Sequence, residues 1–564
     1  MLIRFKMNKR YYLMLVLASV LTLSACKKNK SEPQPTTRAE LSLDSIFLYA
    51  KQVYYWNDKL PTYEIFNPRK YTGSTDLDRY ENALFGIAGY SANKYDVYKE
   101  GGVYQNYPKY SFIIDQKEDS GLAGAILNSN NYAVDWNGNG NDIGIRVVSY
   151  LLDNTYTKYL PFVTAVYPNS PADHAGIKRG WVITKINGQT YGTNYTNEKK
   201  SLNDALNANS VPLELTNYLT GTKINITLTK TAYKTSPIYA SKIFTAGAKK
   251  IGYINLARFS ILTGLFNDPA NYTDTYLDPV FAEFASAGVT DLVVDLRYNG
   301  GGYSVMVDHM LNLMAPSSLD GQTTYAEYYN STMTNDKATI LKNQPMLDAN
   351  NKIQYQNGQI VNYYDHGDYS VSGNTMHFKK KGNLNTVQNI VFLVTGNTAS
   401  SSELVINALK PYMNVKLVGE TTYGKPIGFF PLVIENRYQV WMSMIETKNS
   451  RGEGGYFDGM KPDYDENEII GYDKDENPIY KYPDLWDDVR YDFGDPKEAY
   501  LAQALQILAP GVTVQSSGAG GKLAKTNSTS ANPAGTLSKS KITGKQKLGK
   551  EEFVGMIDQP KRKQ

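Results

Sequence analysis

The stretch from Ile390 to Gly428 constrains the fold most, because strand-like and helix-like patterns alternate within it: IVFLVTGNTASSSELVINALKPYMNVKLVGETTYGKPIG. The apolar run Ile390–Val394 predicts a buried strand. After a short polar turn, apolar residues recur at helical spacing over Leu404–Leu409, and Val415–Val418 predicts a second strand. Strand, sharp turn and helix form the unit that places a nucleophile at the top of a sheet.

Three serines, Ser400–Ser402, occupy the predicted turn, and Lys425 lies in the glycine-containing turn after the second strand. A serine hydroxyl is a weak nucleophile and needs an adjacent base. The chain has only four histidines, but a lysine can act as the base when burial lowers its pKa toward neutrality. Apolar residues follow Lys425 and favour such burial. The alternative is a serine-rich helix N-cap beside a solvated lysine.

The strings T-A-S-S-S-E and G-E-T-T-Y-G-K resemble the carboxy-terminal-processing (tail-specific) serine peptidases, whose pattern is A-S-A-S-E followed by G-x-x-T-[FY]-G-K-G. In that family the nucleophile is the serine three positions before the glutamate, and the lysine base lies 25 residues further on. Counting from Glu403, both rules hold for Ser400 and Lys425. The resemblance therefore implies a Ser400–Lys425 dyad.

The sequence departs from this family at the residue that orients the lysine. The family places a glutamine four positions after the lysine to hold its amine, and here that position is Phe429. Gln439 and Ser443 lie on the next predicted strands, and neither is assigned this role. The group that orients Lys425 stays open.

A second string, D-L-V-V-D-L-R-Y-N-G-G-G at 291–302, resembles the family's D-L-R-x-N-x-G-G turn. The resemblance implies that the N–H groups of Gly301 and Ser401 stabilise the oxyanion. A glycine suits this role because the backbone must approach the substrate closely. The alternative is an ordinary tight turn after a strand.

Residues 142–230 resemble a PDZ domain, most closely in the string S-P-A-D-H-A-G-I-K-R-G-W-V-I-T-K-I-N-G at 170–188. PDZ domains bind peptides by adding them to a sheet edge beside a carboxylate-binding loop. By position, Ile143, Gly144 and Ile145 form that loop. The loop lacks its second glycine, so a PDZ-shaped spacer without a ligand is the alternative.

The string D-W-N-G-N-G-N-D at 135–142 superficially matches a calcium loop. The twelfth position of such a loop is a bidentate glutamate, and here it is Arg146. A glycine-asparagine hairpin turn is therefore favoured. No metal and no cofactor are predicted.

The N-terminus has the pattern of a bacterial lipoprotein signal. Basic residues between Arg4 and Arg10 precede a short apolar run, Tyr11–Leu23, and the lipobox-like Leu-Ser-Ala-Cys ends at Cys26. Cys26 is the only cysteine, so a lipid thioether is its expected use and a membrane is the expected partner. The alternative is an ordinary secretory peptide. The polar run after Cys26 predicts a flexible tether.

The charge distribution argues against a nucleic-acid partner. The net charge of the whole chain is +4, but the n-region is basic, and residues 515–564 hold ten Lys or Arg against three acidic residues. The remaining, folded part is therefore acidic. The serine, glycine and lysine content of residues 515–564 predicts a disordered basic tail.

The expected fold is a multidomain α/β (α+β) protein whose peptidase core the resemblance implies to be ClpP/crotonase-like. The predicted segments are a signal peptide, a tether, a helical N-terminal domain, a PDZ domain, a catalytic domain with an insertion at about 317–384, and the tail; in that order they span 1–25, 26–40, 41–118, 119–235, 236–514 and 515–564.

The sequence thus predicts a lipid-anchored serine endopeptidase of the cell envelope, facing the periplasm or the cell surface, that cleaves unfolded or C-terminal polypeptide segments. Two other functions stay open: a catalytically weak or inactive peptide-binding lipoprotein, and a Ser-His hydrolase that uses His309. No pattern indicates an oligomeric state.

Overall fold

The computed structural model describes residues 36–117, 134–135, 138–260, 273–346, 353–512, 514–517, 537, 541–548, 555–557 and 561–562. The predicted signal peptide, Cys26 and most of the predicted tether lie outside these residues. Within them, no helix is both long enough and apolar enough to span a bilayer.

The N-terminal region is helical, as predicted, and its first helix begins inside the predicted tether. Thr37 caps this helix: its hydroxyl accepts the N–H of Glu40, whose carboxylate accepts the N–H of Thr37. The helices are α2 (Arg38–Val53), η1 (Asn57–Lys59), α3 (Tyr63–Phe66), η2 (Pro68–Lys70), α4 (Asp76–Ala88) and η3 (Ala92–Lys94).

Three strands close this region and join it to the rest of the chain. β1 (Val97–Glu100) and β2 (Val103–Pro108) form a hairpin. β3 (Phe112–Asp115) pairs with β25 (Tyr438–Trp441), which also pairs with β24 (Leu432–Ile434). The N-terminal helices share one hydrophobic core with strands that follow Lys425, so this region packs directly against the lysine turn.

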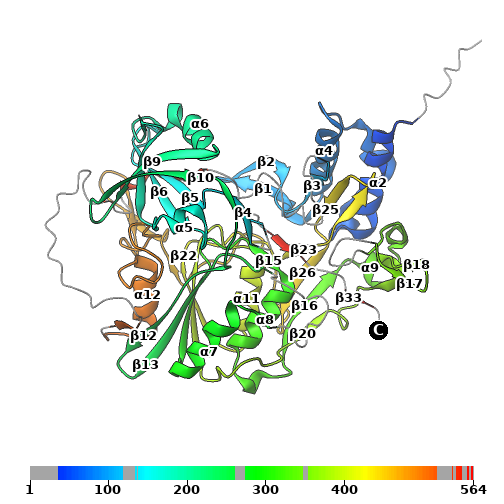
Figure 1. Cartoon of the computed structure of the whole chain (residues 1–564). Coiled ribbons are helices and arrows are strands. Elements are labelled where there is room, and N and C mark those ends of the chain that lie inside the picture. Colours follow the sequence, from blue (N-terminus) through cyan, green and yellow to red (C-terminus); the bar gives the residue numbers. More distant parts are fainter. Residues whose placement is uncertain are drawn as a thin grey trace, which may run out of the picture.

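The PDZ region is an antiparallel sheet with two helices (Figure 1). Its strand order is β10-β9-β7-β6-β5-β31, and β8 pairs with β7. The elements are β5 (Ile145–Leu151), β6 (Tyr159–Val166), α5 (Pro171–His174), β7 (Trp181–Ile186), β8 (Gln189–Thr190), α6 (Tyr195–Leu206), β9 (Ser210–Asn217) and β10 (Lys223–Thr229). Beside it, β4 (Asn139–Asp142) pairs with β11 (Thr231–Lys234).

The peptidase core is built on a seven-stranded sheet with the order β27-β22-β21-β14-β13-β12-β30. The strands from β13 to β27 pair in parallel, and β12 and β30 are antiparallel additions at one edge. The strands are β12 (Ile238–Ala246), β13 (Lys249–Leu256), β14 (Asp291–Asp295), β21 (Asn389–Val394), β22 (Asn414–Gly419), β27 (Tyr464–Asp465) and β30 (Val514–Ser517).

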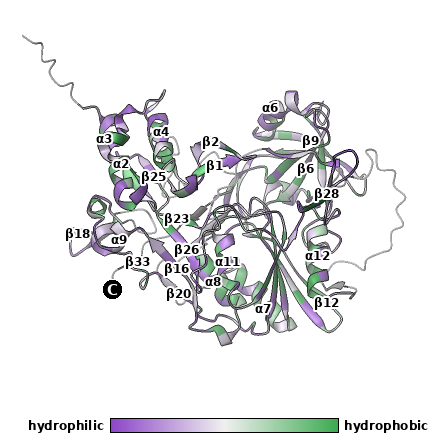
Figure 2. Ribbon diagram, turned by 180° about the vertical axis from the view of Figure 1, so that it is seen from behind, coloured by the Kyte–Doolittle hydropathy of each residue, from purple (hydrophilic) through white to green (hydrophobic). Residues whose placement is uncertain are grey.

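Helices cover both faces of this sheet, because its central strands are apolar on both sides. One face packs against α7 (Leu277–Ala287), α8 (Ser304–Met314) and α11 (Ser401–Leu409), and the other against α12 (Ala499–Leu508). Hydrophobic residues run along all four helices (Figure 2). The predicted strand–turn–helix unit is thus confirmed as β21 followed by α11.

A second sheet lies beside the core and has the order β15-β32-β23-β26-β16-β20. Its strands are β15 (Gly301–Tyr303), β16 (Thr323–Tyr329), β20 (Thr375–His377), β23 (Ile427–Phe429), β26 (Ile445–Asn449) and β32 (Gly555–Ile557). Two of them, β16 and β20, come from the predicted insertion, so that part of it is integral to the fold.

The rest of the predicted insertion forms short elements around this sheet. They are η4 (Ser317–Leu319), α9 (Ser331–Thr334), η5 (Thr339–Asn343), β17 (Tyr355–Gln356), β18 (Gln359–Ile360), α10 (Tyr363–His366) and β19 (Gly367–Asp368). β18 ends at Ile360, and a helical turn follows it closely. The side chain of Asn362 accepts the N–H groups of Tyr364 and Asp365, and so starts this helical turn. A further hairpin, β28 (Ile469–Tyr472) and β29 (Pro478–Tyr480), precedes α12.

The prediction of a disordered tail is wrong for its described residues. β31 (Gly544–Leu548), β32 and β33 (Lys561–Arg562) each pair with a strand from another part of the chain, as does β30. Composition misses these strands because their hydrogen-bond partners lie hundreds of residues away. A polar segment gains order when a sheet edge supplies such partners.

A buried ionic cluster joins the PDZ region to the core. Arg297, next to the glycine turn, forms ion pairs with Asp295 (2.9 Å), Asp487 (2.8 Å) and Glu498 (2.8 Å). Asp487 also pairs with Arg179 of the PDZ region at 2.6 Å. One carboxylate therefore serves two arginines from two domains, and both guanidinium groups are buried.

Replacing Asp487 with asparagine is expected to lower the stability of the chain by roughly 3–5 kcal/mol, because two buried arginines lose their shared counter-charge. Denaturant unfolding followed by circular dichroism measures the change. Asp484→Asn is the matched control, since Asp484 is an exposed aspartate in the same loop. Equal stability of the two variants would contradict a structural role for the cluster.

Candidate active site

Ser400 sits at a strained turn between β21 and α11. Its backbone has φ +60° and ψ −111°, a conformation that non-glycine residues rarely adopt and that is found at functional sites. The side chain is 1% exposed. Among the described residues, its Oγ has no hydrogen-bond partner. The turn therefore presents a buried hydroxyl that is not used by the fold.

The carboxylate of Glu403 ties this turn to the lysine turn. Its Oε2 accepts the backbone N–H of Ser400 and that of Lys425, each at 2.8 Å. Its Oε1 accepts the N–H of Gly424 at 2.7 Å and the hydroxyl of Thr422. Burial raises the pKa of the Glu403 carboxyl, and these donors oppose that shift. One oxygen atom thus fixes the backbones of both predicted dyad residues next to each other.

Lys425 is buried among aromatic rings. Its side chain is 2% exposed, and its Nζ lies 4.5 Å from the ring centroid of Phe429 and 5.8 Å from that of Tyr110. Burial lowers the pKa of the Lys425 amine to about 7, against the opposing effect of the carboxylates of Asp96 and Glu403. An amine with this pKa is partly neutral at neutral pH, as a general base must be.

Phe429 therefore replaces the polar contact of the family's glutamine with an apolar one. At the position four residues after the lysine, an aromatic ring thus lies against the amine. The Oε1 of Gln439 accepts the indole N–H of Trp441 at 3.3 Å, and the hydroxyl of Ser443 donates to Asp96 at 3.1 Å.

Asp96 is a site residue that the sequence analysis missed. It is fully buried and its Oδ2 accepts the hydroxyls of Tyr54 (2.9 Å), Ser111 (2.6 Å) and Ser443 (3.1 Å). It is also the carboxylate with the largest charge effect on the Lys425 amine. No local pattern marks this position, because Asp96 lies in the N-terminal region, far from both motifs.

The two predicted oxyanion donors differ in their availability. Ser401 is the first residue of α11, where a backbone N–H has no acceptor within the helix. The N–H of Gly301 instead donates to the Oδ1 of Asn299 at 2.9 Å. The glycine turn and the serine turn are held together, since the hydroxyls of Ser401 and Ser402 donate to the carbonyls of Gly302 (2.8 Å) and Asn299 (3.0 Å).

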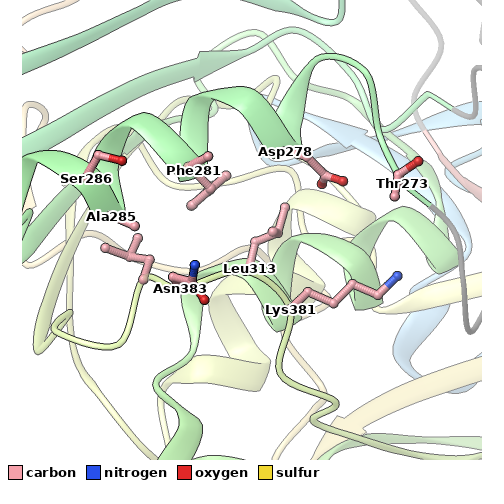
Figure 3. A pocket seen from close by; sticks show the side chains of 11 residues that line it. Thr273, Asp278, Phe281, Ala285, Ser286, Leu313, Lys381 and Asn383 are labelled. Carbon is pink, nitrogen blue, oxygen red and sulfur yellow. The ribbon is translucent and has the colours of Figure 1, made fainter.

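His309 belongs to a different part of the core. Its Nε2 lies 2.6 Å from the Oδ1 of Asp278 on α7, and burial lowers the pKa of its imidazole. Asp278 lines a pocket of about 690 Å³ between α7 and the segment before β21, together with Phe281, Leu313 and Lys381 (Figure 3). Ser400 does not line this pocket. The structure therefore does not bring His309 to Ser400 as a base.

A second pocket, of about 500 Å³, borders the lysine turn. Thr422 and Tyr423 line one side of it, and Tyr95, Lys109 and Phe457 are among the residues that line the other. The hydroxyl of Tyr423 donates to the carbonyl of Lys109 at 3.1 Å, so the N-terminal region closes this side of the site.

The predicted PDZ loop adopts a tight turn at the start of β5. Gly144 has φ +83°, and its N–H donates to the Oδ1 of Asp142 at 2.7 Å. Ile143 is buried in the PDZ core, and Ile145 opens β5, where it pairs with Val166. In place of the calcium-like loop, Asp135 accepts the N–H of Asn139 at 2.7 Å in a turn that leads into β4; residues 136–137 lie outside the described ranges.

Replacing Lys425 with methionine is expected to change the free energy of unfolding differently at pH 7 and pH 9. The value for the variant relative to the parent should be roughly 2–3 kcal/mol more favourable at pH 7 than at pH 9. In the folded parent the amine binds its proton only below about pH 7, whereas in the unfolded chain it keeps the proton up to its ordinary pKa. The stability of the parent therefore rises with pH between these values, and the advantage of the variant falls.

Urea unfolding of parent and variant at the two pH values measures this difference. Lys461→Met is the matched control, because Lys461 is an exposed lysine of a nearby loop and its replacement is expected to show no such dependence. An equal gain for Lys425→Met at both pH values would contradict a lowered pKa.

Comparison with known proteins identifies two regions. Residues 250–465 match the model of peptidase family S41, and residues 162–197 match that of the PDZ domain. The carboxy-terminal processing protease CtpB of Bacillus subtilis is 22% identical over 263 residues, which cover 47% of this chain and 43% of CtpB. CtpA of the same organism is 25% identical over 327 residues, 58% of this chain and 56% of CtpA. The chain thus spans about half the length of these curated relatives.

The fold is similar to that of a crystal structure from Bacteroides fragilis NCTC 9343, described as a candidate S41 protease. The TM-score is 0.51 and the sequence identity 21%, with 82% of this chain and 96% of the other covered. At this identity the likeness shows the fold, and it confirms the predicted multidomain α/β class.

Proposed function

We propose that the protein is a serine endopeptidase that cleaves unfolded or C-terminal polypeptide segments, because residues 250–465 match the model of peptidase family S41. The observation that carries the proposal is the carboxylate of Glu403, one oxygen of which holds the backbones of both Ser400 and Lys425. Ser400 is the proposed nucleophile and Lys425 the proposed base.

In the proposed mechanism the neutral amine of Lys425 takes the proton of the Ser400 hydroxyl as its Oγ attacks the scissile carbonyl. The tetrahedral intermediate then collapses, Lys425 returns the proton to the leaving amine, and water hydrolyses the acyl-enzyme by the same route. Among the described residues the Ser400 Oγ has no hydrogen-bond partner, so the proposed Ser–Lys hydrogen bond would form in the substrate complex, as catalytic hydrogen bonds often do.

The oxyanion of this intermediate would bind first to the N–H of Ser401, which lies at the start of α11. The N–H of Gly301 joins it only when Asn299 releases it, since the two are hydrogen-bonded here. Substrate binding would therefore include a small rearrangement of the glycine turn.

A second candidate function is peptide binding without turnover. It is favoured by the occupied N–H of Gly301 and by the apolar Phe429 in place of the family's glutamine. The two functions differ in one chemical property: an active site labels with a serine-directed fluorophosphonate at Ser400, and an inactive binder does not.

Replacing Ser400 or Lys425 with alanine is expected to reduce cleavage of an unfolded protein such as casein by a factor of about 10³ or more, because each change removes a reacting group. Fluorophosphonate labelling should fall in parallel. Ser372→Ala and Lys461→Ala are matched controls at exposed positions and should cleave at the parental rate. Full activity in either dyad variant would exclude this mechanism.

The proposal includes attachment to the cell envelope through a lipid on Cys26, with the active site facing the periplasm or the cell surface. It is supported by the basic, apolar and lipobox-like segments before Cys26. Cys26→Ser is expected to move the protein from the detergent-soluble membrane fraction to the soluble fraction and to abolish incorporation of labelled palmitate. Unchanged membrane retention without palmitate would contradict the lipid anchor.

A further inference from the structure

We propose that the C-terminal segment of this chain is a tethered occupant of its own substrate path, with β31 on the edge of the PDZ sheet and β32 between β15 and β23, beside the proposed active site. The inference rests on the proposed function, because only a peptidase has a substrate path at these strands. The positions of β31 and β32 themselves come from their strand pairings.

The first half of the argument is the position of β31. It pairs antiparallel with β5, from Gly544 opposite Leu151 to Leu548 opposite Val147, and α6 lies against it. The side chain of Leu548 packs against the PDZ core. PDZ domains take their peptide ligands by adding a strand to a sheet edge, and β5 is the edge that follows the predicted binding loop. β31 thus occupies the place of a ligand.

The PDZ loop is suited to an internal segment of this kind. A ligand that ends in the loop needs a free N–H for its carboxylate, but the N–H of Gly144 already donates to Asp142 at 2.7 Å. The register brings Leu548 only as far as Val147, so the pairing does not use the loop.

Ion pairs with the peptidase core and hydrogen bonds with the PDZ region hold the segment at this point. The Nζ of Lys545 lies 3.1 Å from Glu420 and 3.8 Å from Glu466, both of which belong to the peptidase core. Thr543 adds two hydrogen bonds at 2.9 Å, from its N–H to the carbonyl of Leu151 and from its hydroxyl to that of Asp153. Opposite charge therefore draws the basic segment to the junction between the PDZ region and the core.

The second half of the argument is the position of β32. It lies between β15 and β23 and is parallel to both, with Gly555 opposite Gly301, and Met556 opposite Gly302 and Gly428. Figure 1 shows it as a red arrow beside the labels β15 and β23. β15 begins at the predicted oxyanion residue Gly301, and β23 begins two residues after Lys425. In the proposed function a substrate strand would pair at these same two edges, because they border the proposed nucleophile and base.

The third strand, β33, pairs with β19 of the predicted insertion. The three strands therefore lie, in chain order, on the edge of the PDZ sheet, between β15 and β23, and against β19 of the predicted insertion. A tethered occupant competes at a high effective concentration, because it is part of the same molecule. The full chain is accordingly held in a self-inhibited state that a substrate must displace.

The first experiment compares the full chain with a chain that ends at residue 540. We expect kcat/KM on labelled casein to rise at least about fivefold on truncation. A synthetic peptide of residues 541–564 should restore inhibition, raising KM without changing kcat. Full-length Met556→Pro should also be activated, because proline cannot donate a hydrogen bond to either neighbouring strand. Equal activity of all three chains, with no inhibition by the peptide, would overturn the proposal.

A binding measurement separates this proposal from the proposed function. The labelled peptide should bind the truncated Ser400→Ala chain by fluorescence anisotropy, and Lys545→Ala in the peptide should weaken binding about tenfold. Lys547→Ala is the matched control, since Lys547 is exposed. Binding that depends on Lys545, together with no casein cleavage by the truncated chain that keeps Ser400, would support occupancy while refuting the peptidase. Failure of the peptide to bind would refute occupancy, whatever the activity.

Discussion

The buried carboxylate of Glu403 is the interaction on which the proposed site depends. It lies in the first turn of α11 and accepts hydrogen bonds from the serine turn and from the lysine turn. Removing it would leave several buried donors without an acceptor, which costs more than the bonds themselves contribute. The same carboxylate therefore holds the strained backbone of Ser400 and sets the separation of the two turns.

The lowered pKa of the Lys425 amine comes chiefly from burial. The rings of Phe429 and Tyr110 flank its amine, and the N-terminal region supplies both the hydroxyl of Tyr110, which donates to the carbonyl of Gly424 at 2.6 Å, and the carboxylate of Asp96. The N-terminal region, which lies far from Lys425 in the sequence, thus completes the surroundings of the proposed base. Apolar surroundings lower the pKa of a lysine amine because they disfavour its charged form.

Much of this was predictable from local patterns. The β21–α11 unit, the lysine turn and the PDZ strings are read from spacing, because their chemistry lies within a few residues of each motif. Three features were not. Asp96 acts across more than 300 residues of sequence, the engagement of Gly301 by Asn299 depends on a side-chain rotamer, and the strands of the tail exist only against distant edges. Sequence composition reports none of these, since each is decided by tertiary contacts.

The shared carboxylate of Asp487 has a consequence for how access to the site is controlled. It joins Arg179 of the PDZ region to Arg297 beside the glycine turn, so a swing of one domain away from the other would strand a buried cation. A rigid-body rotation of the PDZ region away from the core is therefore unfavourable, and the two domains are expected to keep their relative placement. A polypeptide that enters the proposed active site would therefore have to do so while the two domains keep their relative placement.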